Sequence, residues 1–216
     1  MPLQQWIPQM AEGCVLTIKL FLITALFSVP LGLVFTFLYT TKNKLINKIV
    51  GLYILIMRGT PLLLQIFFVY FGLPYVPVIG EYLTINDRFT AGAVAFILNY
   101  AAYFAEIFRG GLLSVDKGQY EAAKVLGMTD MQTRFKIVLP QMFRIALPSV
   151  SNEAIVLIKD TALITAIGLT DLLKVTQTIV NRTTNISAFA VAALFYLVMS
   201  YVLTVFFKFL EKKFSF

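Results

Sequence analysis

Six ionisable side chains interrupt long apolar stretches of this sequence, and they are the first candidates for chemistry. They are Lys19, Arg58, Glu106, Glu153, Lys159 and Asp160. A charged group that faces lipid is costly, so such residues usually face a protein interior or a water-filled path. Arg58, Asn99 and Glu153 lie about 12–15 Å inside their stretches, at about 1.5 Å per helical residue. A cation, an amide and a carboxylate at one depth could bind a zwitterion, or they could satisfy one another.

Two of the apolar stretches are broken by polar residues, at positions 58–61 (Arg-Gly-Thr-Pro) and 159–161 (Lys-Asp-Thr). Within a membrane, a discontinuous helix lines protein or a water-filled cavity, because its freed backbone groups need partners. An α-amino acid needs a cation for its carboxylate and a carboxylate for its ammonium group. Glu153 and Asp160 are seven residues apart and would share a helix face. The predicted cargo-binding residues are Arg58, Asn99, Glu153, Lys159, Asp160 and Thr161.

Some of the charged residues also have local interpretations. Lys19 lies close enough to the start of its stretch to extend its ammonium group to the membrane surface. Glu106 and Arg109 are three residues apart, so a local ion pair is the favoured interpretation there. At the level of the sequence, Arg58 and Glu106 could either contact cargo or form structural pairs.

The composition is that of a membrane protein. Hydrophobic residues make up 59% of the chain and charged residues 13%, about half the charged share of a soluble domain, and the mean hydropathy is +0.82. The net charge is +7, but the basic residues cluster between apolar stretches, so topology explains them and no nucleic-acid partner is expected. With a single cysteine, Cys14, and no histidine, we expect no disulfide framework, no Cys/His metal site and no histidine triad.

We predict an all-α membrane protein that forms one transmembrane domain over residues 1–216. Continuous apolar runs favour helices over a β-barrel, and the first run is too long for a cleavable signal peptide. The predicted spans are 14–39, 49–71, 89–108, 145–169 and 186–207. Twelve basic residues on one side against three on the other place the N-terminus outside and the C-terminus in the cytoplasm. Five helices are few for a complete transport path, so pairing with a copy or a close relative is expected.

The longest segment between spans, residues 109–144, has the pattern of two short helices. Residues 119–126 are good helix formers, and Gly127 fits the left-handed position that follows a helix. Thr129 and Gln132 form a capping-box pattern for a second helix, which Pro140 is expected to end. The segment therefore predicts a rigid cytoplasmic projection. An amphipathic helix on the membrane surface is the alternative that the pattern alone leaves open.

This projection resembles the "EAA" signature of ABC-importer permeases. The matching positions are Glu121, Ala122, Ala123, Gly127, Ile137, Leu139 and Pro140. The resemblance implies a coupling helix, with Gln119 and Glu121 near its start and Ala122 and Ala123 on its contact face, that docks into a separate ATPase subunit. The chain has no Walker-type phosphate-binding loop, so no cofactor is expected on it, and ATP with Mg²⁺ belongs to the partner.

Three further segments resemble polar amino-acid permeases of the histidine/glutamine/arginine group, at 58–65, 103–111 and 151–161. The resemblance implies a polar amino acid as cargo, carried by alternating access. It also implies two ATPase copies, a second permease bundle that is identical or a paralogue, and an extracytoplasmic solute-binding protein. The expected location is the cytoplasmic membrane of a prokaryote, as a multi-pass protein. An excess of carboxylates at the predicted midplane favours a basic amino acid, and the resemblance does not fix which one.

Two other classes of function compete with the permease. A stand-alone secondary transporter or channel would need no large docking projection and would show an ion-coupling site. An intramembrane enzyme is disfavoured by the absence of histidine and of a paired-carboxylate signature within one helix.

Overall fold

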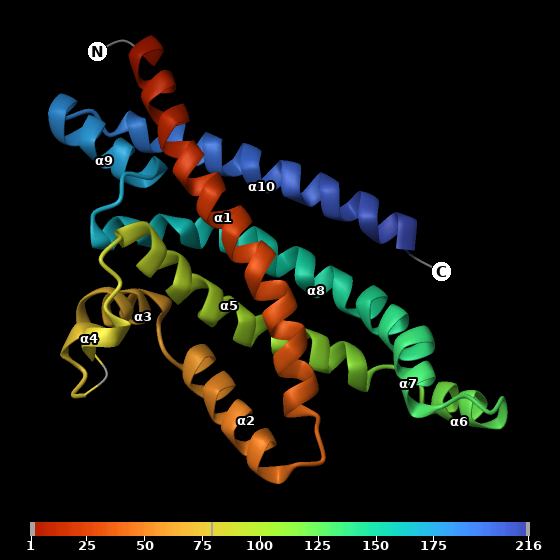
Figure 1. The fold of residues 1–216 in the computed structure, drawn as a ribbon. Coiled ribbons are helices and arrows are strands. Elements are labelled where there is room, and N and C mark those ends of the chain that lie inside the picture. The colour runs from red at the N-terminus through yellow and green to blue at the C-terminus, as the bar shows by residue number, and fades with distance from the viewer. Residues whose placement is uncertain (1–2, 79, 215–216) are drawn as a thin grey trace.

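The computed structural model describes residues 3–78 and 80–214, and these residues form helices and connecting turns without a strand (Figure 1). The α-helices are α1 (Leu3–Tyr39), α2 (Lys44–Gly59), α3 (Leu62–Phe67), α4 (Gly80–Leu83), α5 (Arg88–Leu113), α6 (Lys117–Val125), α7 (Asp130–Gln132), α8 (Leu139–Asp160), α9 (Leu172–Thr183) and α10 (Ser187–Phe214). Two π-helical turns, η1 (Phe68–Gly72) and η3 (Thr133–Val138), and two 3₁₀ segments, η2 (Leu73–Tyr75) and η4 (Thr161–Ile167), complete the chain. The predicted all-α class is confirmed.

Three helices, α1, α5 and α10, are long and apolar enough to cross a membrane on their own. The segments Lys44–Gly59 and Leu62–Tyr75 make a fourth candidate span if they are taken together, with a bend of 108° between them. Helix α8 carries Arg144, Glu153, Lys159 and Asp160 and is not among these candidates. Its crossing, and the five-span count with its orientation, remain predictions.

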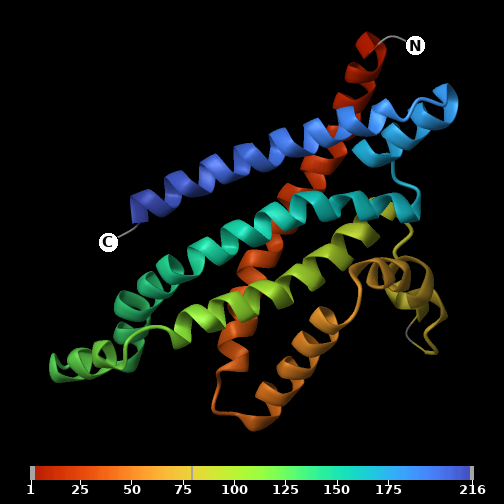
Figure 2. The same cartoon turned by 180° about the vertical axis from the view of Figure 1, so that it is seen from behind.

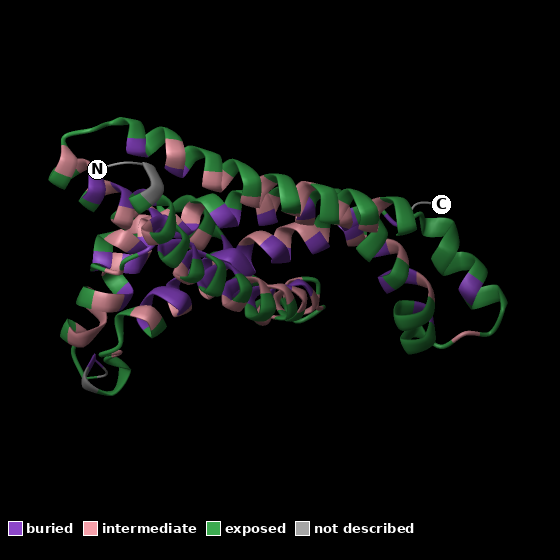
Figure 3. Ribbon diagram, turned by 90° about the horizontal axis from the view of Figure 1, so that it is seen from above, coloured by how far each residue is buried: buried purple, intermediate pink, exposed green. Residues whose placement is uncertain are grey.

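The two ends of the bundle carry different parts of the chain (Figures 1 and 2). The N-terminus, α4 and α9 lie at one end, and the C-terminus, α6 and α7 lie at the other. Termini at opposite ends are what an odd number of crossings requires. Helix α10 runs beside α8, and Ala188 and Ala192 are its only buried residues among those described (Figure 3). Half-buried residues of α10 such as Met199 and Leu203 pack against the core, whereas its exposed apolar side chains, among them Leu194 and Tyr201, are available to lipid or to another subunit.

Helix α5 is the centre of the fold because small residues let α1 cross it closely. A Cβ atom on Gly32 of α1 would lie 2.6 Å from the Cβ of Phe104, so only glycine fits at the crossing. The Thr36 hydroxyl donates a hydrogen bond to the Ala105 carbonyl at 3.0 Å. Small residues and hydroxyl bonds between helices are the usual way for helices to associate in lipid.

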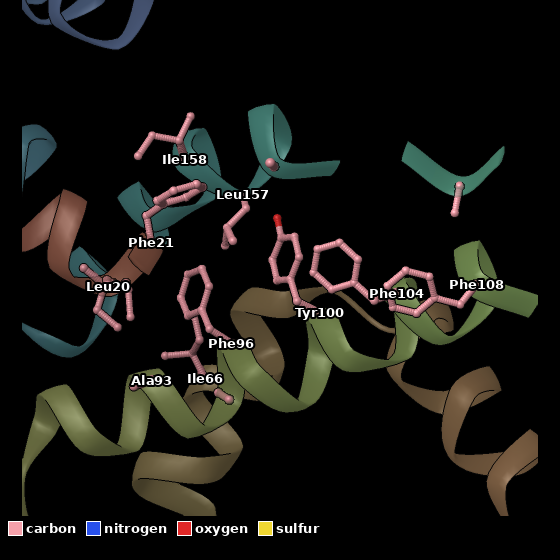
Figure 4. Close-up of a cluster of buried hydrophobic side chains, with 14 of the residues drawn as sticks. Leu20, Phe21, Ile66, Ala93, Phe96, Tyr100, Phe104, Phe108, Leu157 and Ile158 are labelled. Atoms are coloured by element: carbon pink, nitrogen blue, oxygen red, sulfur yellow. The ribbon is translucent and has the colours of Figure 1, made fainter. Parts of the chain in front are cut away.

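One face of α5 carries an aromatic stripe that forms the main core (Figure 4). Phe96, Tyr100, Phe104 and Phe108 recur every fourth residue, and each is at most 1% exposed. Their ring centroids follow one another at 6.2–6.4 Å. Residues of α1 and α8 cover the stripe, including Leu20, Phe21, Leu157 and Ile158. With this face packed, an adjoining face of α5 is left for polar residues.

The projection at residues 109–144 folds largely as its sequence predicts. Helix α6 ends at Val125, and Gly127 has a φ of +72°, the left-handed conformation expected after a helix. The capping box of Thr129 and Gln132 is present at the start of α7. The expectation that Pro140 ends this helix is wrong. The chain passes through the π-helical η3 directly into α8, and Pro140 lies at this joint without interrupting the helix.

Candidate functional site

A polar cavity of about 510 Å³ lies where α2 and α3 bend against α5 and α8. Its lining residues are Arg58, Gly59, Thr60, Pro61, Leu62, Asn99, Tyr100, Tyr103, Glu153, Val156, Asp160 and Leu163. Four of the six predicted cargo-binding residues, Arg58, Asn99, Glu153 and Asp160, therefore line one cavity. Its volume is within the range of about 300–1,000 Å³ that is usual for small-molecule sites.

Pro61 creates the break beside this cavity, and two amide side chains stabilise it. The Met57 carbonyl would accept the N–H of residue 61 in a continuous helix, but proline has none. The Asn99 and Gln65 side chains donate to this carbonyl instead, at 3.0 and 2.9 Å. Asn99 also donates to the Gln65 side-chain oxygen at 3.0 Å, and Gln65 donates to the Thr60 hydroxyl at 2.8 Å. The side-chain amide of Asn99 thus stabilises the bend between α2 and α3.

Arg58, at the end of α2, is held loosely. Its side chain is 44% exposed, its Nη1 atom is 3.9 Å from Oε2 of Glu106, and its guanidinium lies 5.5 Å from the Tyr103 ring centre. Glu106 is engaged more closely by Arg109, at 2.7 Å, so the predicted local pair of Glu106 and Arg109 is confirmed. Because its own contact with Glu106 is long, Arg58 can turn its guanidinium toward an anion in the cavity.

The two carboxylates of the cavity, both on α8, differ in how they are engaged. Asp160 accepts a hydrogen bond from the Tyr100 hydroxyl at 2.8 Å. Glu153 is half-buried, and it forms no hydrogen bond or ion pair with any residue in the described part of the chain. The charged lining groups are one cation, Arg58, and two carboxylates, Glu153 and Asp160. With all three ionised, the lining carries one net negative charge.

The other two predicted cargo-binding residues do not line the cavity. Lys159 is exposed and lies outside the lining. Thr161 is fully buried, and its hydroxyl donates to the Ile158 carbonyl at 2.7 Å. At the predicted interruption, residues 159–161, α8 passes directly into the 3₁₀ segment η4, so the helix changes type there without a gap. Lys159 and Thr161 therefore lie outside the cavity that the other four predicted residues line.

Two tyrosines of the lining, Tyr100 and Tyr103, were missed by the sequence prediction. Tyr100 belongs to the aromatic stripe of the core, so its spacing in the sequence predicts packing alone. The hydrogen bond from its hydroxyl to Asp160 could not be predicted from that spacing. Tyr103 could have been found, because Asn99, Tyr103 and Glu106 recur at helical spacing along one polar face of α5.

A second polar cavity, of about 570 Å³, shares Arg58, Tyr103 and Glu153 with the first. It extends along α5 past Glu106 and Ser114, toward the end of the bundle that carries α6. The two cavities together form a polar path along one side of α5 and α8.

At the far end of that path, helix α6 projects from the bundle with an exposed surface. Gln119, Glu121 and Ala122 are exposed, as are Val125 and Leu126 at 86% and 78%. The expectation that Ala123 belongs to the contact face is wrong. Ala123 is only 3% exposed because it lies on the side of α6 that packs against η3 of the same chain. The Gln141 amide also donates to the Gln119 side chain at 3.0 Å, which ties α6 to α8.

A bent-helix membrane bundle with a polar path and a rigid projection has the architecture of a transport protein. Residues 28–216 match the family described as "Binding-protein-dependent transport system inner membrane component", and the chain belongs to this family. Such a protein is the permease subunit of an importer and not its catalyst, since ATP hydrolysis takes place on a separate ATPase subunit. An ATPase and a binding protein are accordingly its classes of partner. The family thus supports the permease over a stand-alone transporter.

Curated relatives align over nearly the whole chain. A Rickettsia bellii protein named for glutamine transport is 36% identical over 94% of this chain and 91% of its own length. The arginine transport system permease protein ArtQ of Bacillus subtilis is 36% identical over 96% of this chain and 93% of its own length. The L-cystine transport system permease protein TcyB of Bacillus subtilis is 36% identical over 83% of this chain and 74% of its own length.

Solved structures show the same fold. A crystal structure of an amino acid ABC transporter with histidines matches with a TM-score of 0.87 and 31% identity, over 97% of this chain and 95% of that chain. The inward-facing MetNI methionine ABC transporter matches with a TM-score of 0.75 over the full length of both chains. At 17% identity, that second likeness concerns the fold alone.

Proposed function

We propose that this chain is the permease subunit of an ATP-driven importer of polar amino acids, and that it favours cargo with a positively charged side chain. The observation that carries the proposal is the cavity with one cation and two carboxylates beside the α2–α3 bend. The names of the relatives, which refer to glutamine, arginine and cystine, support amino acids as the cargo class.

Each charged group of the cavity has a place in this proposal. Arg58 binds the α-carboxylate of the cargo, for which its guanidinium offers two parallel donors. Asp160 or Glu153 binds the α-ammonium group, and the other carboxylate is left for a basic side chain. A neutral polar amino acid would leave one carboxylate of the cavity unpaired, which is unfavourable in a partly buried site.

The assembly in this proposal contains two permease bundles, identical or paralogous, with two ATPase subunits and an extracytoplasmic solute-binding protein. ATP and Mg²⁺ bind on the ATPases. Gln119, Glu121 and Ala122 of α6, with Gly127 at its end, form the surface that docks with an ATPase. The exposed Val125, Leu126 and Met131 support this role, because apolar side chains at the water-facing end of a membrane protein call for a protein partner.

The mechanism in this proposal is alternating access in the cytoplasmic membrane of a prokaryote. ATP binding closes the ATPase pair, and the closure moves α6. Because η3 joins the α6–α7 projection to α8 without a break, the movement of α6 is passed to the helix that carries Glu153 and Asp160. Hydrolysis then resets the path toward the cytoplasm.

The test is cargo-stimulated ATP hydrolysis by the complete complex in liposomes, with the binding protein supplied. Arginine or lysine should stimulate hydrolysis more strongly than glutamine, and glutamate should not stimulate it. Equal stimulation by glutamate would contradict the assignment of the cavity charges. Uptake by the chain alone, driven by an ion gradient without ATP, would favour a secondary transporter.

A further inference from the structure

An apolar pocket of about 320 Å³ lies between α1, α5, α8 and α10, away from the polar path. Phe143, Leu147 and Val150 of α8 line it, together with Phe108 of α5, whose ring centre is 5.6 Å from that of Phe143. Arg144 is the only charged residue among the described residues that line it. The pocket therefore combines an apolar interior with a single cation.

The two faces of α8 serve different environments. Ile145, Ser149 and Glu153 line the polar cavities, whereas Leu147 and Val150 line the apolar pocket. Residues at these spacings point to different sides of a helix, because an α-helix turns once in about 3.6 residues. The pocket lies off the polar path, and its apolar lining suits an apolar occupant and not a polar cargo.

The charges at one end of the pocket favour an anionic group. Besides Arg144, Lys212 and Lys213 lie in the last turn of α10, next to Phe214, which also lines the pocket. Glu211 is the one acidic residue in this turn, so the cations outnumber it. From Arg144 to Val150 the pocket extends about 9 Å along α8, at about 1.5 Å per residue. An anionic head with an apolar tail fits this arrangement.

We propose that this pocket binds an anionic membrane phospholipid, with its phosphate near Arg144 and an acyl chain along Phe143, Leu147 and Val150. Basic pockets between membrane helices are a recognised kind of site for anionic lipid headgroups. The pocket lies at the same end of the bundle as α6, so the lipid would occupy the leaflet on that side. It would pack against the beginning of α8, where movement of the projection enters the bundle.

The proposal can be tested by native mass spectrometry of the purified full-length chain, titrated with phosphatidylglycerol or with phosphatidylcholine of the same acyl chains. The wild-type chain should retain phosphatidylglycerol in preference. Arg144→Gln should lower that retention about five-fold, roughly the effect of one basic side chain near an anionic surface, and should leave phosphatidylcholine unchanged. Val150→Trp, which fills the pocket, should lower retention of both lipids.

Two control variants distinguish binding in this pocket from non-specific attraction between basic side chains and an anionic lipid. Lys48→Gln removes the same charge from an exposed position on α2 and should retain lipid like the wild type. Arg144→Lys preserves the charge and should retain phosphatidylglycerol even if Arg144→Gln fails to fold. Equal retention of the two lipids by the wild type, or retention unaffected by Val150→Trp, would overturn the proposal. Loss of a chain–chain dimer in Val150→Trp without loss of lipid would show that another copy fills the pocket.

Discussion

At the scale of single residues, the site depends on one missing hydrogen-bond donor. Pro61 leaves the Met57 carbonyl without a helical partner, and the side chains of Asn99 and Gln65 replace it. Asn99 is 4% exposed, so its amide is withdrawn from water to make these bonds. A polar residue buried in this way stabilises the fold only while its partners remain.

Asn99→Ala should therefore destabilise the protein by about 1 kcal/mol, because Gln65 still serves the carbonyl while the Asn99 bonds are lost. Pro61→Ala restores an N–H to position 61, so Asn99→Ala should cost less in that background. Thermal unfolding of the four proteins of this cycle measures the coupling. Strictly additive effects would mean that Asn99 does not compensate for the proline.

The charge of the cavity gives a second prediction at this scale. Glu153→Gln should reduce the preference for basic over neutral amino acids about ten-fold, because it removes a charge-assisted interaction worth about 1.5 kcal/mol. The measurement is the ratio of half-saturating concentrations in cargo-stimulated ATP hydrolysis. Glu12→Gln, a change at an exposed glutamate of α1, is the matched control and should leave the ratio unaltered. An unchanged ratio in Glu153→Gln would remove this carboxylate from the cargo site.

The site residues that could be predicted from the sequence are charged residues within apolar stretches, because burying a charge is unfavourable and such residues are easily recognised. Arg58, Glu153 and Asp160 stand out because charges are rare in apolar stretches. Lys159 met the same criterion, and Thr161 was predicted as part of the same polar break, yet neither lines the cavity. A pattern of spacing does not reveal which face of a helix is open. The hydroxyl of Tyr100 finds Asp160 sixty residues away in the chain, which no local pattern indicates.

At the scale of elements, the helix breaks and caps could be predicted from the sequence, but the way in which consecutive helices join could not. Gly127 and the capping box at Thr129 are local features, so the sequence predicts them well. The continuous passage through η3 into α8 depends on a π-helical turn, which has no reliable signature in the sequence. The burial of Ala123 likewise depends on how α6 packs against η3.

The left-handed conformation of Gly127 makes it the most sensitive position of the projection. Gly127→Val should strain the turn by about 1–2 kcal/mol and change the angle between α6 and α7, since a branched side chain tolerates positive φ poorly. Cargo-stimulated ATP hydrolysis should then fall well below that of the wild type, with the membrane helices still folded by circular dichroism. Gly127→Asn, at a position where asparagine is tolerated, should retain most of the coupling. A loss of the same size in both variants would indicate a contact and not a conformational requirement.

At the scale of the whole molecule, α8 connects the two functional ends. It begins at Leu139, where η3 joins it to the projection, and it ends at Asp160 in the cavity. Its residues span about 32 Å along the helix axis. The aromatic stripe of α5 packs along it, and the Gln119–Gln141 bond fixes α6 to its first turns. A single helix fastened at both ends can carry a displacement without a separate relay.

This connection predicts how changes at the two ends combine. If the cavity and the projection act in series through α8, then Glu153→Gln and Gly127→Val together should lower cargo-stimulated ATP hydrolysis no further than the more severe single variant. If the two ends act independently, their effects should multiply. The measurement is the rate of hydrolysis by the reconstituted complex at a cargo concentration below half-saturation, where Glu153→Gln alone lowers the rate, compared for the wild type, both single variants and the double variant. A multiplied loss would contradict α8 as the coupling element, because demonstrated coupling between two ends, and not their position on one helix, is what a shared mechanism requires.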